Sequence, residues 1–488
     1  MCEVVRRLLV VGQRPAVNPK VLVAVLAFAG IVAALMQSLV VPLLADLPSL
    51  LDTTASNASW AVTGTLVAAG VCVPITGRLG DMYGKRRMLL VCTVPLILGS
   101  VACALATSVG PMIAGRALQG IGMGMVPIGI SAMRDLIPAE KLNSSIALMS
   151  ASMGIGGALG LPIAAAVAEG TSWRMLFWGS AALSLVVGLL LWKFVPATPV
   201  EGEPGKFDPV GAIGLTVGLV SLLIAVTKGA TWGWSSATIL ALFAVAVVVL
   251  LAWGWWELRT HDPLIDLRTT ARPQVLLTNI AGLVVGFAMY AQSLILPQLL
   301  QLPESTGYGL GQSMLQMGLW MAPCGFVMMA VSPLGAKLSS ARGPKVTLMV
   351  GALIIAAAYA LSMVLMGSAS GLMIVGAVCG AGTGFTYGAM PTLIMGAVPR
   401  SETAAANALN TLMRSLGTSF AAAVVGVVLA QMSVQVGDYT IPTEAGFRTG
   451  LLIGCGVALV AAAVAAMIPA SRPASTPAPE AELVGARH

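Results

Sequence analysis

Charged residues are scarce in this chain. Asp, Glu, Lys and Arg together make up 9% of its 488 residues, whereas about a quarter of the residues in a soluble globular protein are charged. Six of the seven cysteines fall inside apolar runs, where a thiol acts as a small hydrophobe rather than a disulfide partner. No cluster of His, Cys and acidic residues has metal-ligand spacing. We therefore expect a membrane protein rather than a soluble one, without a metal or a cofactor.

The sequence also lacks the signatures of an ATP-driven machine or an enzyme. It has no Gly-x-x-x-x-Gly-Lys-Ser/Thr loop to hold the phosphates of ATP, and no catalytic constellation. The first twenty residues carry four basic residues but no small-residue cleavage site, and a full-length apolar run follows. We therefore expect no cleaved signal peptide.

Apolar residues are abundant instead, at 57% of the chain. A membrane-spanning helix needs about 20 predominantly apolar residues. Fourteen runs of this kind are present, at 21–44, 58–77, 88–108, 110–133, 145–168, 176–195, 209–228, 236–257, 274–301, 311–334, 345–367, 370–396, 404–432 and 446–469. The sequence therefore predicts an all-α polytopic membrane protein with fourteen transmembrane helices.

The basic residues predict how these helices are oriented. With the N-terminus in the cytoplasm, nearly all of the 26 Lys and Arg residues fall on the cytoplasmic side. The exceptions are Arg174, Lys228 and Arg448 outside, and Arg116 and Arg414 within spans. We expect both termini in the cytoplasm and the protein in the cell membrane. The net charge of +7 then reflects topology and does not call for a nucleic-acid partner.

Glycine patterns recur between the two parts of the chain. Gly120-x-Gly122-x-Gly124 in the fourth span reappears as Gly380-x-Gly382-x-Gly384 in the twelfth. This repetition predicts two six-helix halves with two helices inserted between them. The predicted divisions are a cytoplasmic segment 1–20, a first half 21–195, a linker with the two inserted helices 196–273, a second half 274–469 and a disordered tail 470–488.

One stretch concentrates charge and glycine between the second and third spans. It reads Gly77-Arg-Leu-Gly-Asp81-Met-Tyr-Gly84-Lys85-Arg86-Arg87. Asp81 can form an ion pair with the basic cluster or cap the N-terminus of another helix. The stretch therefore predicts a conformational gate made of Gly77, Asp81, Gly84, Lys85, Arg86 and Arg87. The alternative is an ordinary cytoplasmic loop whose charges only set the topology.

This stretch resembles the helix 2–3 loop of the major facilitator superfamily of secondary transporters. Arg116-x-x-Gln119-Gly-x-Gly is similar to the span-4 motif of that family, in which the arginine faces a central cavity. Gly156, Gly160 and Pro162 partly resemble the antiporter motif Gly-Pro-x-x-Gly-Gly in the fifth span. The resemblance implies the fold of that superfamily, a small-molecule substrate and a role in export.

Further matches narrow the resemblance to fourteen-helix drug:proton antiporters. They are Ser172-Trp-Arg-x-x-Phe-Trp178 at the sixth span, Phe207-Asp208-x-x-Gly211 before the seventh, Trp232-Gly-Trp234 after it, and Glu257-x-Arg259…Asp262-Pro-Leu-Ile-Asp-Leu267 before the ninth. The alternative is that these aromatic and acidic residues only anchor the loops at the interface.

The chain departs from these antiporters in its first span. The acid that the family usually carries there is replaced by Met36 or Gln37, and none of the 19 acids falls clearly at the middle of a span. Proton coupling would then use Asp46, Asp81 or Glu169. The second-half counterpart of Asp81 is Ser340, so we expect the gate to be one-sided.

The remaining polar residues within spans predict a cavity without a carboxylate. Its candidates are Gln37, Arg116, Gln119, Tyr290, Gln292, Tyr387 and Arg414. We expect a monomeric secondary exporter of amphipathic molecules, neutral, zwitterionic or anionic rather than strongly cationic, with protons and the lipid bilayer as partners. The sequence leaves open a proton-independent facilitator or lipid-type exporter on the same fold, and a membrane sensor or scaffold on a degenerate transporter fold.

Overall fold

The computed structural model describes the chain except for residues 1–17, 41–42, 44–45, 198–205, 437–438 and 470–488. Most of the predicted segment 1–20 and all of the predicted tail 470–488 lie outside the described residues. Within the described residues, 14 helices are long and apolar enough to cross a membrane. The predicted all-α membrane protein with fourteen spans is confirmed.

Six spans precede the predicted linker, and the fourth is interrupted. They are α2 (Pro19–Ser38), α5 (Trp60–Tyr83), α6 (Lys85–Ala104), α7 (Val109–Gly122) continued by α8 (Met125–Leu136), α9 (Ala139–Gly170) and α10 (Arg174–Phe194). The short helices α3 (Leu47–Leu50) and α4 (Ala55–Ala58) join α2 to α5. The break at Met123–Gly124 falls in the predicted glycine pattern, consistent with the low helix propensity of glycine.

Eight further spans follow. They are α11 (Pro209–Trp232), α12 (Ala237–Glu257), α14 (Pro273–Gln301), α15 (Met314–Arg342), α16 (Pro344–Leu365), α17 (Ala369–Met395), α18 (Thr403–Gln431) and α19 (Glu444–Met467). Short elements α13 (Leu267–Thr270), η2 (Glu304–Thr306) and η3 (Arg400–Glu402) lie in the connections. An antiparallel hairpin of β1 (Ser433–Val436) and β2 (Tyr439–Pro442), which we did not predict, precedes α19.

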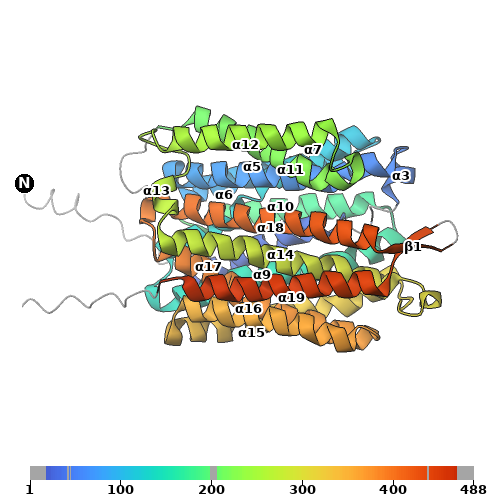
Figure 1. Cartoon of the computed structure of the whole chain (residues 1–488). Coiled ribbons are helices and arrows are strands. Elements are labelled where there is room, and N and C mark those ends of the chain that lie inside the picture. The colour runs from blue at the N-terminus through green and yellow to red at the C-terminus, as the bar shows by residue number, and fades with distance from the viewer. Residues whose placement is uncertain (1–17, 41–42, 44–45, 198–205, 437–438, 470–488) are drawn as a thin grey trace, which may run out of the picture.

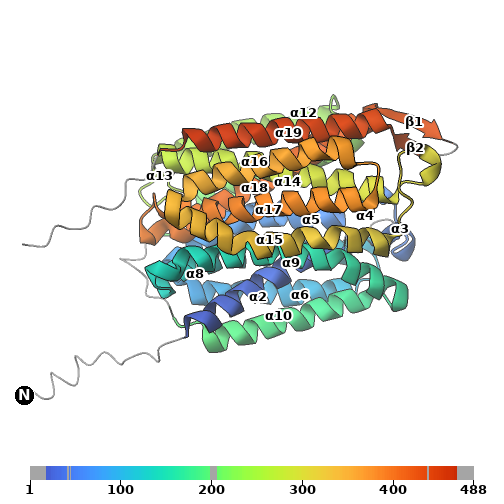
Figure 2. The ribbon, with the colours of Figure 1, turned by 90° about the horizontal axis from the view of Figure 1, so that it is seen from below.

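The long helices run side by side, so the bundle has two ends (Figures 1 and 2). Helix α2 begins and α19 ends at one of them, here called the termini end, and the β1–β2 hairpin marks the other, here called the hairpin end. The α5–α6 turn, with the predicted gate, lies at the termini end because α5 returns from the hairpin end. Almost all helix-terminal Lys and Arg residues share that end.

The buried apolar side chains form separate cores. One cluster joins α2, α6, α8 and α10, and the largest joins α14, α16, α17 and α19. We call α2 and α5–α10 the first group of helices and α14–α19 the second. Two seams connect these groups: α9 packs along α15, and α5 packs along α18. Both seams rely on missing side chains, because a Cβ on Gly325 would overlap the backbone of Gly154, and one on Gly77 would lie 2.6 Å from the Ala408 Cβ.

The inserted helices lie at only one of these seams. Helix α11 packs against both α5 and α18, while α12 packs mainly against α11 and covers the outside of the bundle (Figure 1). Leu264 and Ile265, in the connection after α12, are buried in the same apolar cluster as Val71 of α5 and Leu412 of α18. The inserted pair and its connection therefore bridge the α5–α18 seam.

Candidate functional site: a charged latch at the termini end

The turn between α5 and α6 consists of a single residue. Helix α5 ends at Tyr83 and α6 begins at Lys85, with Gly84 alone between them. Gly84 adopts φ +93°, a conformation that residues with a Cβ rarely take. This geometry places Asp81, in the last turn of α5, and Lys85, in the first turn of α6, next to each other.

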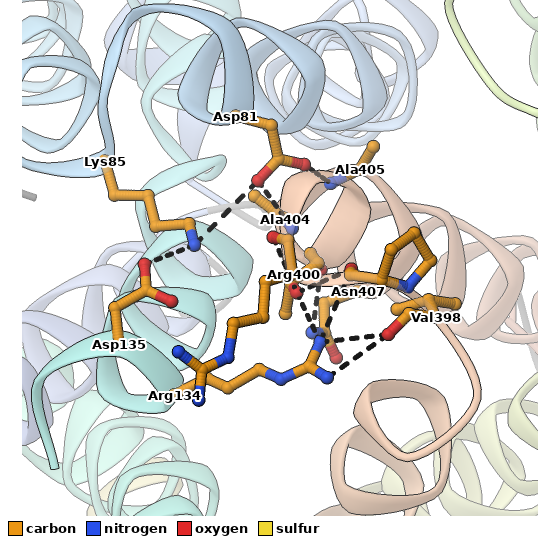
Figure 3. Close-up of polar contacts among 11 residues, drawn as sticks. Asp81, Lys85, Arg134, Asp135, Val398, Arg400, Ala404, Ala405 and Asn407 are labelled. Carbon is orange, nitrogen blue, oxygen red and sulfur yellow. Dashed lines mark hydrogen bonds and ion pairs between the residues drawn. The ribbon is translucent and has the colours of Figure 1, made fainter. Parts of the chain in front are cut away.

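Asp81 joins the two groups of helices by capping α18 (Figure 3). Its carboxylate accepts the backbone N–H of Ala404 at 3.1 Å and that of Ala405 at 2.9 Å. These are among the first amides of α18, which have no partner within their own helix. The side chain of Asp81 is 2% exposed. A negative charge here is favoured by the positive N-terminal end of the helix dipole.

Lys85 connects Asp81 to a second acid. Its Nζ lies 2.5 Å from Asp135 Oδ2 and 4.0 Å from Asp81 Oδ1, and its side chain is 7% exposed. Asp135 belongs to the last turn of α8. The lysine therefore ties α5, α6 and α8 together beside the capped end of α18 (Figure 3).

Arg134, next to Asp135, makes the second link across this seam. Its guanidinium donates to the carbonyl oxygen of Val398 at 3.2 Å and to Thr403 Oγ1 at 2.6 Å. Sequence reasoning counted Arg134 only as a topological charge. The adjacent Arg134–Asp135 pair at the end of a span could have indicated it. Asp81, Lys85, Arg134 and Asp135 are called the latch below.

The other predicted gate residues serve the first group of helices. Arg86 donates to the backbone carbonyl of Trp192 in α10 at 2.5 Å, and Arg87 is exposed. Gly77 permits the close approach of α5 to Ala404 and Ala408 of α18. At the α9–α15 seam, Ser340 is exposed, and in the part of the chain that the structure describes its hydroxyl accepts a 3.5 Å hydrogen bond from Asn143. The charged latch therefore lies at the α5–α18 seam.

Arg116 and Gln119 lie inside the first group of helices rather than beside an open cavity. Arg116 is 2% exposed, and its guanidinium donates to Met36 O at 2.8 Å, Ala61 O at 3.2 Å and Gln119 Oε1 at 2.6 Å. Gln119 in turn donates to Ser100 Oγ at 2.8 Å. The expected cavity-facing arginine thus cross-links α2, α5 and α7 in this conformation.

The second-half candidates form a separate group. The Arg414 guanidinium of α18 lies 4.3 Å from the ring centre of Tyr387 in α17, and Tyr387 Oη contacts Met289 Sδ at 3.0 Å. Tyr290 is half-buried and packs against the large apolar core. Gln292 is buried, and its Nε2 has no hydrogen-bond partner among the described residues. Arg414 is half-buried, so part of its side chain is exposed.

The remaining candidates are dispersed. Gln37 is exposed in the last turn of α2, and Asp46 is exposed before α3 at the hairpin end. Glu169 belongs to the last turn of α9. Asp81 is placed at a contact between the two groups of helices.

The glycines and proline of α9 have distinct packing roles. A Cβ on Gly156 would overlap the carbonyl oxygen of Ile31, and one on Gly160 would overlap Ser38, both in α2. Pro162 instead contacts α15, because a Cβ on Gly318 would lie 3.0 Å from its nitrogen. This part of α9 packs between α2 and the facing α15.

Comparison with known proteins agrees with this architecture. A model of the Major Facilitator Superfamily matches residues 26–422 and, separately, 279–486. The chain belongs to the major facilitator superfamily, and it is a multi-pass membrane protein of a family of transporters.

Individual relatives are more distant. The chain is 26% identical over 343 residues to the uncharacterized MFS-type transporter YhcA of Bacillus subtilis, covering 70% of this chain and 63% of that protein, so it spans less than two thirds of that relative's length. It is 26% identical over 383 residues to multidrug resistance protein 3 of Bacillus subtilis, covering 76% and 72%. The crystal structure of the human organic anion transporter MFSD10 has the same fold, with a TM-score of 0.64, 15% identity and coverage of 93% and 100%.

Proposed function

We propose that this chain is a secondary active exporter of amphipathic small molecules that works by alternating access and is coupled to protons. The observation that carries the proposal is the latch. Asp81 caps α18 across the seam and Arg134 binds the residues just before it, so both contacts must break before the two groups of helices separate at the termini end. Each contact is polar and replaceable by water, as a reversible gate requires.

The termini end is proposed to face the cytoplasm. The described basic residues at that end include the cluster Lys85–Arg87 and Arg134, whereas the hairpin end has Arg174, Lys228 and Arg448. Cytoplasmic loops carry the excess of Lys and Arg in membrane proteins. In this orientation the latch closes the cytoplasmic side.

The proposed substrates are neutral, zwitterionic or anionic. Arg414 is a half-buried cation within a span, and its guanidinium lies over the aromatic ring of Tyr387. A cation in the membrane interior is costly and is usually kept for a function. The similarity to multidrug resistance protein 3 supports export of drug-like molecules.

Proton coupling is proposed to act through Asp81. Protonation would remove the negative charge that the α18 dipole and Lys85 stabilise, which would weaken the latch. The acid and the gate would then be one group, which explains how coupling could persist without an acid in the first span.

Transport in proteoliposomes tests these proposals together. We expect uptake of an anionic or neutral fluorescent dye against its gradient when an outward-directed proton gradient (acidic vesicle lumen) is imposed, because dye enters in exchange for protons, and loss of that uptake in Asp81→Ala. Glu140→Gln, an exposed acid at the start of α9, is the matched control. Dye that equilibrates without responding to the proton gradient would indicate a facilitator. Absence of flux for all dyes would favour a sensor or scaffold.

A further inference from the structure

A second acidic site lies within the inserted pair, at the termini end. Asp208 precedes α11 and Glu257 is the last residue of α12, and they are 7% and 2% exposed. A Cβ built on Gly211 would contact a carboxylate oxygen of each residue. The two carboxyl groups therefore converge on the one glycine that leaves room for them.

Each oxygen of Asp208 accepts one hydrogen bond. Oδ1 accepts the backbone N–H of Gly211 at 2.9 Å, which caps α11, and Oδ2 accepts the indole N–H of Trp256 at 3.0 Å. A carboxyl group that accepts hydrogen bonds on both oxygens is best satisfied when it is ionised. Asp208 is thus the carboxylate of the pair.

Glu257 is not satisfied in the same way. Its Oε2 accepts a long hydrogen bond, 3.4 Å, from the backbone N–H of Ile265. Its Oε1, the oxygen nearest Gly211, and the indole nitrogen of Trp253, which lies beside this carboxyl group, form no hydrogen bond of standard geometry among the described residues. A buried oxygen without a donor, facing a second carboxylate, lacks one hydrogen.

Charged groups on the neighbouring elements do not donate a hydrogen bond to Glu257 Oε1. Arg268 of α13 donates to the carbonyl of Leu258, Arg259 lies over the Trp255 ring at 4.1 Å, and His261 is paired with Asp262. Two ionised carboxylates close together in a dry site repel each other, and one of them takes up a proton instead. A metal ion would require more oxygen ligands than this pair offers.

We propose that Glu257 is a proton-binding site, with the proton on Oε1 shared with the carboxylate of Asp208, and that this proton holds the connection after α12 in place. Ile265, which donates to Glu257, is buried with Leu264 in the apolar cluster that joins α5, α11 and α18. Loss of the proton adds a second buried negative charge, which water reaches only when this connection lifts. The docking of Leu264 and Ile265 beside the latch therefore weakens as pH rises.

Infrared spectroscopy of the full chain in lipid vesicles tests the proton directly, and does not depend on the proposed transport function. We expect a carboxylic-acid C=O band that is present at neutral pH, disappears at alkaline pH and is missing from Glu257→Gln. Glu140→Gln should keep the band, and Glu257→Asp, which retains a carboxyl group, should keep it at a shifted position. Absence of the band from the wild-type protein, or its persistence in Glu257→Gln, would overturn the proposal. A band whose intensity changes with sodium concentration at constant pH would also overturn the proposal, because it would indicate a cation site and not a proton site.

Hydrogen exchange tests the consequence for the connection. After correction for the intrinsic pH dependence of exchange, protection of the amides of residues 258–267 should fall at least several-fold with rising pH in the wild-type protein. In Glu257→Gln, where the side chain is neutral at every pH, that protection should stay constant. Equal pH responses in the two proteins would refute the link between the proton and the docking of Ile265.

Discussion

Asp81 Oδ2 accepts the backbone N–H of Ala405 at 2.9 Å, across 324 positions of sequence. In this contact a side chain at the end of α5 accepts a backbone N–H at the start of α18 that has no partner within its own helix. It depends on the position of α18 relative to α5 and not on the folding of either helix. The variants below separate these two properties.

The first prediction concerns Asp81 itself. Asp81→Ala removes both acceptors and the charge, so we expect the contact at the termini end to weaken by about 1–2 kcal/mol. Asp81→Asn should have a smaller effect, since its one oxygen can still accept a single N–H. The measurement is dye efflux from loaded cells at matched protein levels. Efflux at the wild-type rate in both variants would exclude the latch as a gate.

Arg134 should act on the same contact. Arg134→Gln removes the hydrogen bonds to Val398 and Thr403, and we expect slower export without loss of folded protein. Because Asp81 and Arg134 hold the same helix start, the effects of Asp81→Asn and Arg134→Gln should not be additive. A double-mutant cycle on the efflux rate measures this coupling, and additive effects would show that the two links are independent.

Gly77 tests the close approach of α5 to α18. In Gly77→Ala the new methyl group would lie 2.6 Å from Ala408 Cβ and 2.8 Å from Ala404 O. We expect a loss of about 1–3 kcal/mol in the closed arrangement through overpacking. Gly64→Ala, in the same helix, meets its nearest atom at 3.4 Å and should be close to neutral. Thermal unfolding and efflux of the pair are the measurements, and equal behaviour would contradict the packing.

Arg116 and Arg414 should respond differently to removal. Arg116→Ala leaves the acceptors Met36 O, Ala61 O and Gln119 Oε1 without their shared donor, at a cost of about 3 kcal/mol or more. We therefore expect a clear fall in the unfolding temperature. Arg414→Ala loses the contact with the Tyr387 ring, about 0.5–2 kcal/mol, and should unfold close to the wild-type temperature. The opposite order of unfolding temperatures would contradict these roles.

Arg414 should also select substrates by charge. We expect Arg414→Gln to reduce export of an anionic dye at least tenfold while sparing a neutral dye of the same size. Arg448→Gln, whose guanidinium forms an exposed pair with Glu444, is the matched control because it also removes one positive charge. Equal losses for both dyes would indicate that Arg414 supports structure or gating, not recognition.

The spans were predictable because each requires only a long apolar run, and all fourteen runs contain a described helix. The β1–β2 hairpin was not predicted. Residues 433–442 do show the sequence signal of such a motif, because polar and apolar residues alternate on both sides of the turn-forming pair Gly437-Asp438. The sequence already allowed Asp81 to cap the N-terminus of another helix. Its partner could not be identified, since the packing of α18 against α5 brings Ala404 and Ala405 to it.

The direction of Arg116 shows the limit of motif reasoning. A motif indicates that an arginine occupies a given turn of a span, and it does not fix the rotation of that helix or what its neighbours offer. Here the neighbours offer backbone carbonyls of Met36 and Ala61, so the guanidinium is buried. Sequence reasoning missed the latch residue Arg134 because basic residues at the cytoplasmic ends of spans are expected from membrane topology alone.

The placement of α11 against both α5 and α18 makes the two sides of the bundle unequal toward the lipid. The α5–α18 seam is covered by an extra pair of helices, whereas the α9–α15 side presents Leu148, Phe326 and Leu334 to the surroundings. The junction between the two groups of helices is therefore shielded by additional helices on one flank and left uncovered by them on the other.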